Sequence, residues 1–121
     1  MIALGTQLAA EYGDGYLAEY ILEHMPDRAV ITGMRQLGQI TALQASSRLT
    51  LIAIDADTKI RFVRTRTKGK LGEASNIEKF CAREEAENAP PNAQRLFECM
   101  KLAQYRIINE ASLTELKAQL D

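Results

Sequence analysis

The chain has 121 residues, of which 46% are hydrophobic and 26% are charged, and its formal net charge at pH 7 is −1. We expect residues 1–121 to form one domain, with a helical segment at 1–26 and a sheet-containing core at 28–121. A net charge near zero excludes a general attraction to nucleic acids or anionic membranes, so any anion binding must be local. No apolar segment reaches the roughly 20 residues that cross a bilayer, and the start of the chain lacks a signal-peptide pattern, so we expect a cytoplasmic protein.

Three short apolar runs are predicted to be strands. Leu51 to Ile54 is a continuous aliphatic run, short enough for a strand that is buried on both faces, so we place it at the centre of a sheet. Residues 29–32 (AVIT), followed by Gly33, form the second candidate, and residues 105–108 (YRII) form the third. Helical patterns separate the three runs, which is typical of a parallel sheet with helices on its faces.

Helices are expected around these strands, where apolar residues recur with helical spacing or a capping residue stands at the start. Ser75 with Glu78 has the pattern of a capping box, and Ser112 is expected to cap a terminal helix. The predicted fold is an α/β fold with a short, three-stranded, largely parallel sheet flanked by about six helices. Apart from the helix after the central strand, the expected helices cover residues 4–12, 15–24, 35–46, 76–87, 92–102 and the segment after Ser112.

A basic cluster follows the predicted central strand. Residues 59–70 include six basic residues and no acidic one. Asp57 is the better candidate to cap a helix here, and Arg61, Arg64 and Lys68 would then share one side of that helix. A solvated helix face is the simplest interpretation of these cations, and a phosphate or nucleotide contact is the functional alternative.

Other chemically distinctive residues favour structural roles. Nucleic-acid binding fits the basic cluster poorly, because Phe62 is the only aromatic residue among the cations. His24, at a predicted helix end, is expected to interact with the helix dipole. Cys81 and Cys99 lack the spacing of a metal site and are expected to be inert thiols. Arg83 and the glutamates that follow it are expected to form ion pairs within their own helix.

Four segments stand in order along the chain: VITGMR (30–35), AIDADTKIRFVR (53–64), FCAREEAE (80–87) and AQYRIINEASLTEL (103–116). In this order, with a basic glycine-containing loop after the second, they resemble the carboxyl-terminal two-thirds of P-loop nucleotide-type kinases. The likeness is greatest to dephospho-CoA kinases and related archaeal and bacterial ATP-binding kinase-like proteins. Residues 4–22 also resemble their substrate-side helical segment. The resemblance implies ATP-dependent phosphotransfer, with ATP and magnesium as cofactors and a nucleotide or small phosphorylated molecule as ligand.

The resemblance also assigns roles to individual positions. In such kinases the cations of a lid close over the nucleotide phosphates, and a turn near the carboxyl terminus passes the adenine ring. The positions that match are Arg61, Arg64, Lys68 and Lys70 for the lid, Asn109, Glu110 and Ala111 for the base turn, and Arg35 on the substrate side. Thr32 and Gln104 stand where the family commonly has acidic residues. The resemblance assigns no catalytic residue and no metal ligand.

The phosphate-binding loop of that family is not found in the 121 residues. Its pattern, Gly-x-x-x-x-Gly-Lys-Ser/Thr, provides backbone N–H groups, a lysine and a hydroxyl to the phosphates and magnesium. The only Gly-Lys pair, Gly69 and Lys70, is followed by Leu71. By resemblance, the strand before this loop would lie between the strands at 29–32 and 51–54. Unpaired buried backbone groups cost roughly 1–3 kcal/mol each, so a simple gap is not tolerable. Either the strands at 29–32 and 51–54 pair directly, or, as we favour, a second copy of the chain or another partner completes the sheet.

Two functions of different classes follow. The first is a kinase-like protein related to nucleotide and coenzyme kinases, incomplete or inactive alone because the phosphate-binding loop must come from elsewhere. The second is a non-catalytic binding or assembly module that retains the carboxyl-terminal half of the fold. The cations of residues 59–70 favour the first, and the missing loop and Thr32 favour the second.

Overall fold

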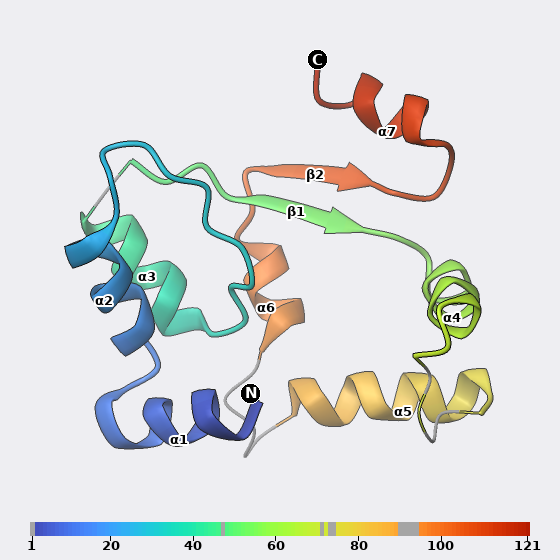
Figure 1. The fold of residues 1–121 in the computed structure, drawn as a ribbon, viewed down its shortest axis with the longest axis horizontal. Coiled ribbons are helices and arrows are strands. Elements are labelled where there is room, and N and C mark those ends of the chain that lie inside the picture. Colours follow the sequence, from blue (N-terminus) through green and yellow to red (C-terminus); the bar gives the residue numbers. More distant parts are fainter. Residues whose placement is uncertain (1, 47, 71, 73–74, 90–94) are drawn as a thin grey trace. The chain divides into compact units, whose positions relative to one another are not determined.

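The computed structural model describes residues 2–46, 48–70, 72, 75–89 and 95–121 (Figure 1). The elements follow in the order α1 (Ile2–Tyr12), α2 (Tyr16–His24), α3 (Leu37–Ser46), β1 (Ile52–Asp55), α4 (Thr58–Thr67), α5 (Ile77–Asn88), α6 (Leu96–Lys101), β2 (Tyr105–Ile108) and α7 (Leu113–Ala118). The described part of the chain is therefore an α/β structure with seven helices and two strands.

The chain divides into two units. The first contains Met1–Thr50 and Glu87–Leu102, and the second contains Leu51–Ala86 and Ala103–Asp121. The first unit is helical, and the second holds both strands. This division does not test the expectation of a single domain, which stays a prediction.

The first unit has a small helical core. Ala18 of α2, Ile40 and Leu43 of α3, and Cys99 of α6 are almost completely shielded from solvent. Asp14 links the helices further, because its Oδ2 accepts a hydrogen bond of 2.9 Å from the backbone N–H of Gly38 in the first turn of α3. A β-carbon at position 38 would lie about 2.0 Å from that carboxylate, so this contact requires glycine.

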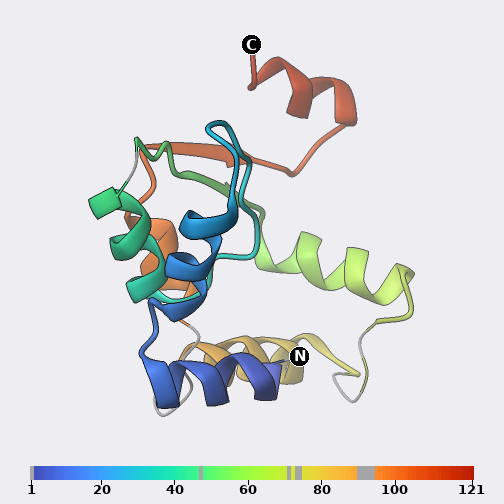
Figure 2. The same ribbon diagram turned by 60° about the vertical axis from the view of Figure 1, so that its left-hand side comes forward.

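The sheet of the second unit is a parallel pair, β1 with β2, as both ribbon views show (Figures 1 and 2). Its register pairs Ile52 with Tyr105 and Asp55 with Ile108. The core of this unit consists of Ala53, Ala56, Phe80 and Ile107, and the rings of Phe62 and Phe80 meet edge to face at 5.6 Å. The parallel pairing of the segments predicted at 51–54 and 105–108 is thus confirmed.

Two expectations about the strands are wrong. Residues 29–32 are not a strand in the structure, where the described residues form a sheet of two strands rather than three. The side chain of Val30 is 93% exposed, and a β-branched run becomes a strand only when a neighbour pairs with its backbone. The central strand is not buried on both faces either, since Ile52 and Ile54 are 47% and 63% exposed.

Several predicted helix ends are confirmed, and one is shifted. Asp57 caps α4, accepting a hydrogen bond of 2.9 Å from the N–H of Lys59, and Ser112 forms a capping box with Glu115 at α7. The start of α5 is capped by Asn76, whose side chain accepts from the N–H of Lys79, so the predicted Ser75–Glu78 box lies one residue too early. The helix expected at 92–102 is observed at Leu96–Lys101, and residues 92–94 of that prediction lie outside the described residues.

Within the described residues, no helix combines the length and apolar character needed to cross a membrane.

Candidate functional site

The carboxyl ends of β1 and β2 meet at one edge of the parallel pair, which is where open α/β sheets bind their ligands. β1 continues through Asp55, Ala56 and Asp57 into α4, and β2 continues into the turn at Asn109 and Glu110. Two hydrogen bonds join these turns: the N–H of Asn109 donates to the carbonyl of Asp55 at 2.7 Å, and the N–H of Asp57 donates to Oε1 of Glu110 at 2.7 Å. The turn after β2 and the start of α4 therefore lie side by side.

Arg61 is held in place by the groups around it. Its Nε and Nη2 donate to the two carboxylate oxygens of Glu84 in α5, at 3.2 and 2.7 Å. Its Nη1 lies 3.4 Å from Oδ1 of Asp55 and donates to the carbonyl of Ala56, while Nη2 also lies 3.2 Å from the hydroxyl of Thr58. The hydrogen bond to Glu84 is the main cause that raises the pKa of the Arg61 guanidinium, against an opposing effect of burial.

The charge of Arg61 is thus balanced by carboxylates of its own unit. Its side chain is 30% exposed, and those of Glu84 and Asp55 are 24% and 29% exposed. Asp55 also lies 3.7 Å from Nη2 of Arg106. An incoming phosphate would have to displace Glu84 before it could form the bidentate contact that a guanidinium offers. Of the predicted lid cations, Arg61 therefore has a structural role, because it joins α4 to α5 through Glu84.

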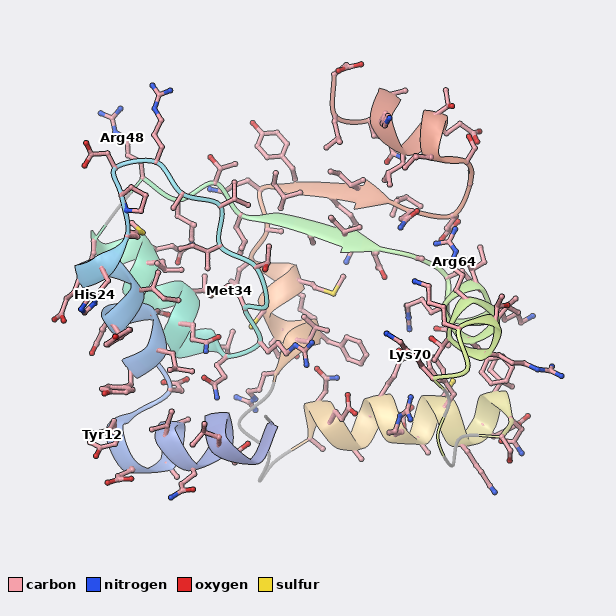
Figure 3. All side chains as sticks on the ribbon, in the orientation of Figure 1. Tyr12, His24, Met34, Arg48, Arg64 and Lys70 are labelled. Carbon is pink, nitrogen blue, oxygen red and sulfur yellow. The ribbon has the colours of Figure 1, made fainter. Side chains whose placement is uncertain are left out.

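Arg64 connects α4 to the base turn. Its side chain is labelled in Figure 3. Its Nη1 donates to the backbone carbonyl of Asn109, a residue 45 positions away in the sequence. This contact holds the turn after β2 against α4. Arg64 is half-buried, and the residue after Asn109, Glu110, accepts the hydrogen bond from the N–H of Asp57.

Lys68 and Lys70 extend from the end of α4. α4 ends at Thr67, and Gly69 follows with a φ of +64°, in the left-handed region. The N–H of Lys70 donates to the carbonyl of Thr65 at 3.1 Å. Both lysines are exposed, and the described part of the chain places no carboxylate within ion-pair distance of either (Lys70 is labelled in Figure 3). In the part of the chain that the structure describes, they are the two predicted lid positions with exposed side chains.

The remaining predicted positions are less informative. Ala111 is exposed in the turn after Glu110. Arg35 lies in the first unit, where its side chain is exposed, its N–H donates to Oε1 of Gln39, and its carbonyl accepts from the N–H of Arg95. No group of three or more histidine, cysteine, aspartate or glutamate residues suited to a metal ion is found among the described residues.

Two contacts were not anticipated from the sequence. Glu84 binds Arg61, 23 residues away, a contact that is not among the ion pairs expected within its helix. The sequence holds a signal for this contact, because Phe80 lies one helical turn before Glu84 on α5 and Phe62 is next to Arg61 on α4. The contact between Phe62 and Phe80 therefore brings Glu84 close to Arg61. Gln104, noted only as a departure from the family, accepts a hydrogen bond from the N–H of Leu51 at 2.5 Å and so holds the start of the strand pair.

The curated proteins found to be similar in sequence to this chain include three UPF0200 proteins. No family model matches it, and no solved structure matches it. It is 29% identical over 107 residues to a UPF0200 protein of Staphylothermus marinus, covering 86% of this chain and 54% of that protein. It is 27% identical over 120 residues to a UPF0200 protein of Hyperthermus butylicus, covering 96% and 62% of the two chains. A UPF0200 protein of Methanocaldococcus jannaschii is 27% identical over 121 residues, covering 95% and 59%.

The chain therefore spans between 54% and 62% of the length of these curated relatives. Each relative contains polypeptide that has no counterpart in the 121 residues. Whatever the whole proteins do, part of their sites can be formed by that additional polypeptide.

Proposed function

We propose that this chain is the carboxyl-terminal part of a P-loop-kinase-like protein and that the sheet edge at α4 binds the phosphates of a nucleotide. In this proposal the dephospho-CoA-kinase-like fold is completed by a strand and phosphate-binding loop from polypeptide outside the 121 residues. The full assembly would transfer phosphate from ATP, with magnesium, to a small acceptor in the cytoplasm.

The observation that carries the proposal is the junction of α4 with the turn after β2. Arg64 binds the carbonyl of Asn109, and Glu110 binds the N–H of Asp57, so residues 45 and 53 positions apart form one edge. This edge lies at the carboxyl ends of parallel strands, the usual ligand position in α/β folds. Lys68 and Lys70 follow the other end of α4, about 15 Å along the helix, and supply exposed positive charge that attracts phosphates.

Glu84 sets the order in which the cations act in this proposal. Lys68 and Lys70 attract the anion first, since they are exposed. Arg61 contacts phosphate only if the ligand competes with Glu84 for its guanidinium. We therefore expect the 121-residue chain to bind nucleotides more weakly than the full assembly and to have no phosphotransfer activity of its own.

The test is a calorimetric titration of the chain with ATP and magnesium. We expect a micromolar dissociation constant that rises about tenfold or more in the double variant Lys68→Ala/Lys70→Ala and also rises with salt. The matched control is Lys79→Ala/Lys117→Ala, which removes two exposed lysines from α5 and α7 of the same unit and should leave the affinity unchanged. An equal loss of affinity in both double variants would contradict a specific role for Lys68 and Lys70 in phosphate binding.

The alternative function, a non-catalytic assembly module, is favoured by a separate observation. Ile52 and Ile54 of β1 remain exposed although they belong to a strand. Strands that keep apolar side chains in solvent are uncommon in isolated proteins and mark contacts with another chain.

A further inference from the structure

The outer edge of β2 is closed by a side chain. The N–H of Ile108 donates to Oε1 of Gln119 at 2.9 Å, and Nε2 of Gln119 donates to the carbonyl of Ile108 at 2.7 Å. The amide of Gln119 thus satisfies a donor and an acceptor of the same residue, as a neighbouring strand would. Of the two β2 residues whose backbone groups face outward, Arg106 and Ile108, Ile108 is therefore already paired.

The opposite edge of the sheet, on β1, has no such cover. The carbonyls of Leu51 and Asp55 accept from Tyr105 and Asn109, so these residues and Ala53 direct their backbone groups to β2. Ile52 and Ile54 then direct theirs to the other side, and no hydrogen bond from them to a second neighbour is found among the described residues. Their side chains are 47% and 63% exposed, so this edge is both unpaired and apolar.

We propose that a second copy of this chain pairs with this edge, so that the two β1 strands run antiparallel about a two-fold axis at Ala53. Ile52 of each copy then lies opposite Ile54 of the other, and each residue presents an N–H and a carbonyl to its partner. The result is a continuous four-stranded sheet in the order β2, β1, partner β1, partner β2. This inference belongs with the alternative function, a non-catalytic assembly module, because in the kinase-like proposal the added strand would occupy this same edge of β1.

The charges along β1 favour the antiparallel pairing. From Leu51 to Ile54 the strand carries no charge, so no like charges meet at the two-fold axis. In the antiparallel register Asp55 lies opposite Leu51 of the partner, about 14 Å along the strands from the other Asp55. A parallel pair in register would instead place Asp55 against Asp55 and Asp57 against Asp57. The strand is therefore complementary to itself in one orientation and repulsive in the other.

The proposal is tested by measuring the mass of the 121-residue chain by sedimentation over a series of concentrations. We expect the mass of two chains, and a dissociation constant that rises about tenfold or more in Ile54→Lys and in Ile54→Pro. Lysine places a charge on the edge, whereas proline removes the outward N–H of residue 54 and leaves the hydrogen bonds from Ala53 and Asp55 to β2. The control is Val63→Lys, which changes a similarly exposed apolar residue of α4 and should leave the dimer intact.

A second measurement covers the case in which the strand variants fail to fold. Amide hydrogen exchange of the unmodified chain should slow at Ile52 and Ile54 as the concentration rises, with little change at Ile108. A chain that remains monomeric at all concentrations would overturn the proposal, and so would a dimer without this protection. Completion of the edge only by added polypeptide, with no self-association, would also overturn it.

Discussion

Arg61 and Glu84 form a two-pronged ion pair between α4 and α5, with Nε and Nη2 of the arginine 3.2 and 2.7 Å from the two carboxylate oxygens. Next to it the rings of Phe62 and Phe80 are in contact. Polar and apolar contacts thus fix the same pair of helices within the second unit. The same ion pair decides which cations of α4 are available to a ligand.

Replacement of Glu84 by alanine should destabilise the second unit by roughly 1–2 kcal/mol, since a partly buried arginine loses its main partner. Urea denaturation measures this change. Glu85→Ala, at the exposed neighbouring position, is the control and should have an effect below about 0.5 kcal/mol. If the two variants are equally stable, the ion pair does not hold α4 and α5 together.

Glu84→Ala also tests whether Arg61 can bind phosphate once it no longer holds α4 against α5. With Glu84 removed, Arg61 is released for phosphate, so Glu84→Ala should bind ATP several-fold more tightly than the unmodified chain. Calorimetry on the two proteins measures this difference. Unchanged affinity would mean that Arg61 takes no part in the phosphate site.

Gln119→Ala should open the outer edge of β2. The N–H of Ile108 then loses its acceptor, and we expect its hydrogen exchange to accelerate about tenfold, while the amide of Ile107, which faces β1, changes little. Leu120→Ala alters the adjacent exposed residue without touching this contact and serves as the control. Equal exchange at Ile108 in both variants would show that the glutamine does not protect the edge.

The stability of the helical structure at the start of α7 should depend on pH. Hydrogen bonds from the backbone and hydroxyl of Ser112 lower the pKa of Glu115 below its ordinary value. A lowered carboxyl pKa stabilises the helix above the ordinary pKa, and this stabilisation is lost as the pH falls through the lowered value. Carbon chemical shifts of α7 should therefore lose helical character on acidification, and Glu115→Gln should abolish most of that dependence. A dependence unchanged in the variant would assign it to another group.

The two cysteines should differ in reactivity. Cys99 is 4% exposed, and burial raises its thiol pKa, whereas Cys81 on α5 is only half-buried. Because the thiolate is the reactive form, iodoacetamide should modify Cys81 about tenfold or more faster near neutral pH. Mass spectrometry of the digested protein measures both sites. Faster modification of Cys99 would contradict the packing of α6 in the first unit.

Local signals predicted much of this structure. Two strands and two helix caps were predicted from residues that are close together in the sequence. The structure has strands at the aliphatic run after Leu51 and at the YRII segment, and helix starts at Asp57 and Ser112. The segment at 29–32 has the same local signal as the strands. Its strand formation, however, depends on a partner strand that the described residues do not contain.

The contacts that define the candidate site could be predicted only in part. The resemblance assigned Arg64 and Asn109 to one ligand, and the structure brings them together. The pairing of Arg61 with Glu84 and the closure of β2 by Gln119 depend on how helices lie across the chain, which no local pattern specifies. Because of these two contacts, fewer groups are open to a ligand or a partner than the sequence suggested. Glu84 binds the guanidinium of Arg61, and Gln119 binds the backbone of Ile108.

The central claim is that phosphates bind where α4 meets the turn after β2, and amide spectra of the isotopically labelled chain during a titration with ATP and magnesium test it most directly. We predict that the largest shifts fall on Lys68, Lys70 and residues 109–111, with smaller shifts at Arg61. Shifts confined to other parts of the chain, or no shifts at saturating nucleotide, would contradict it.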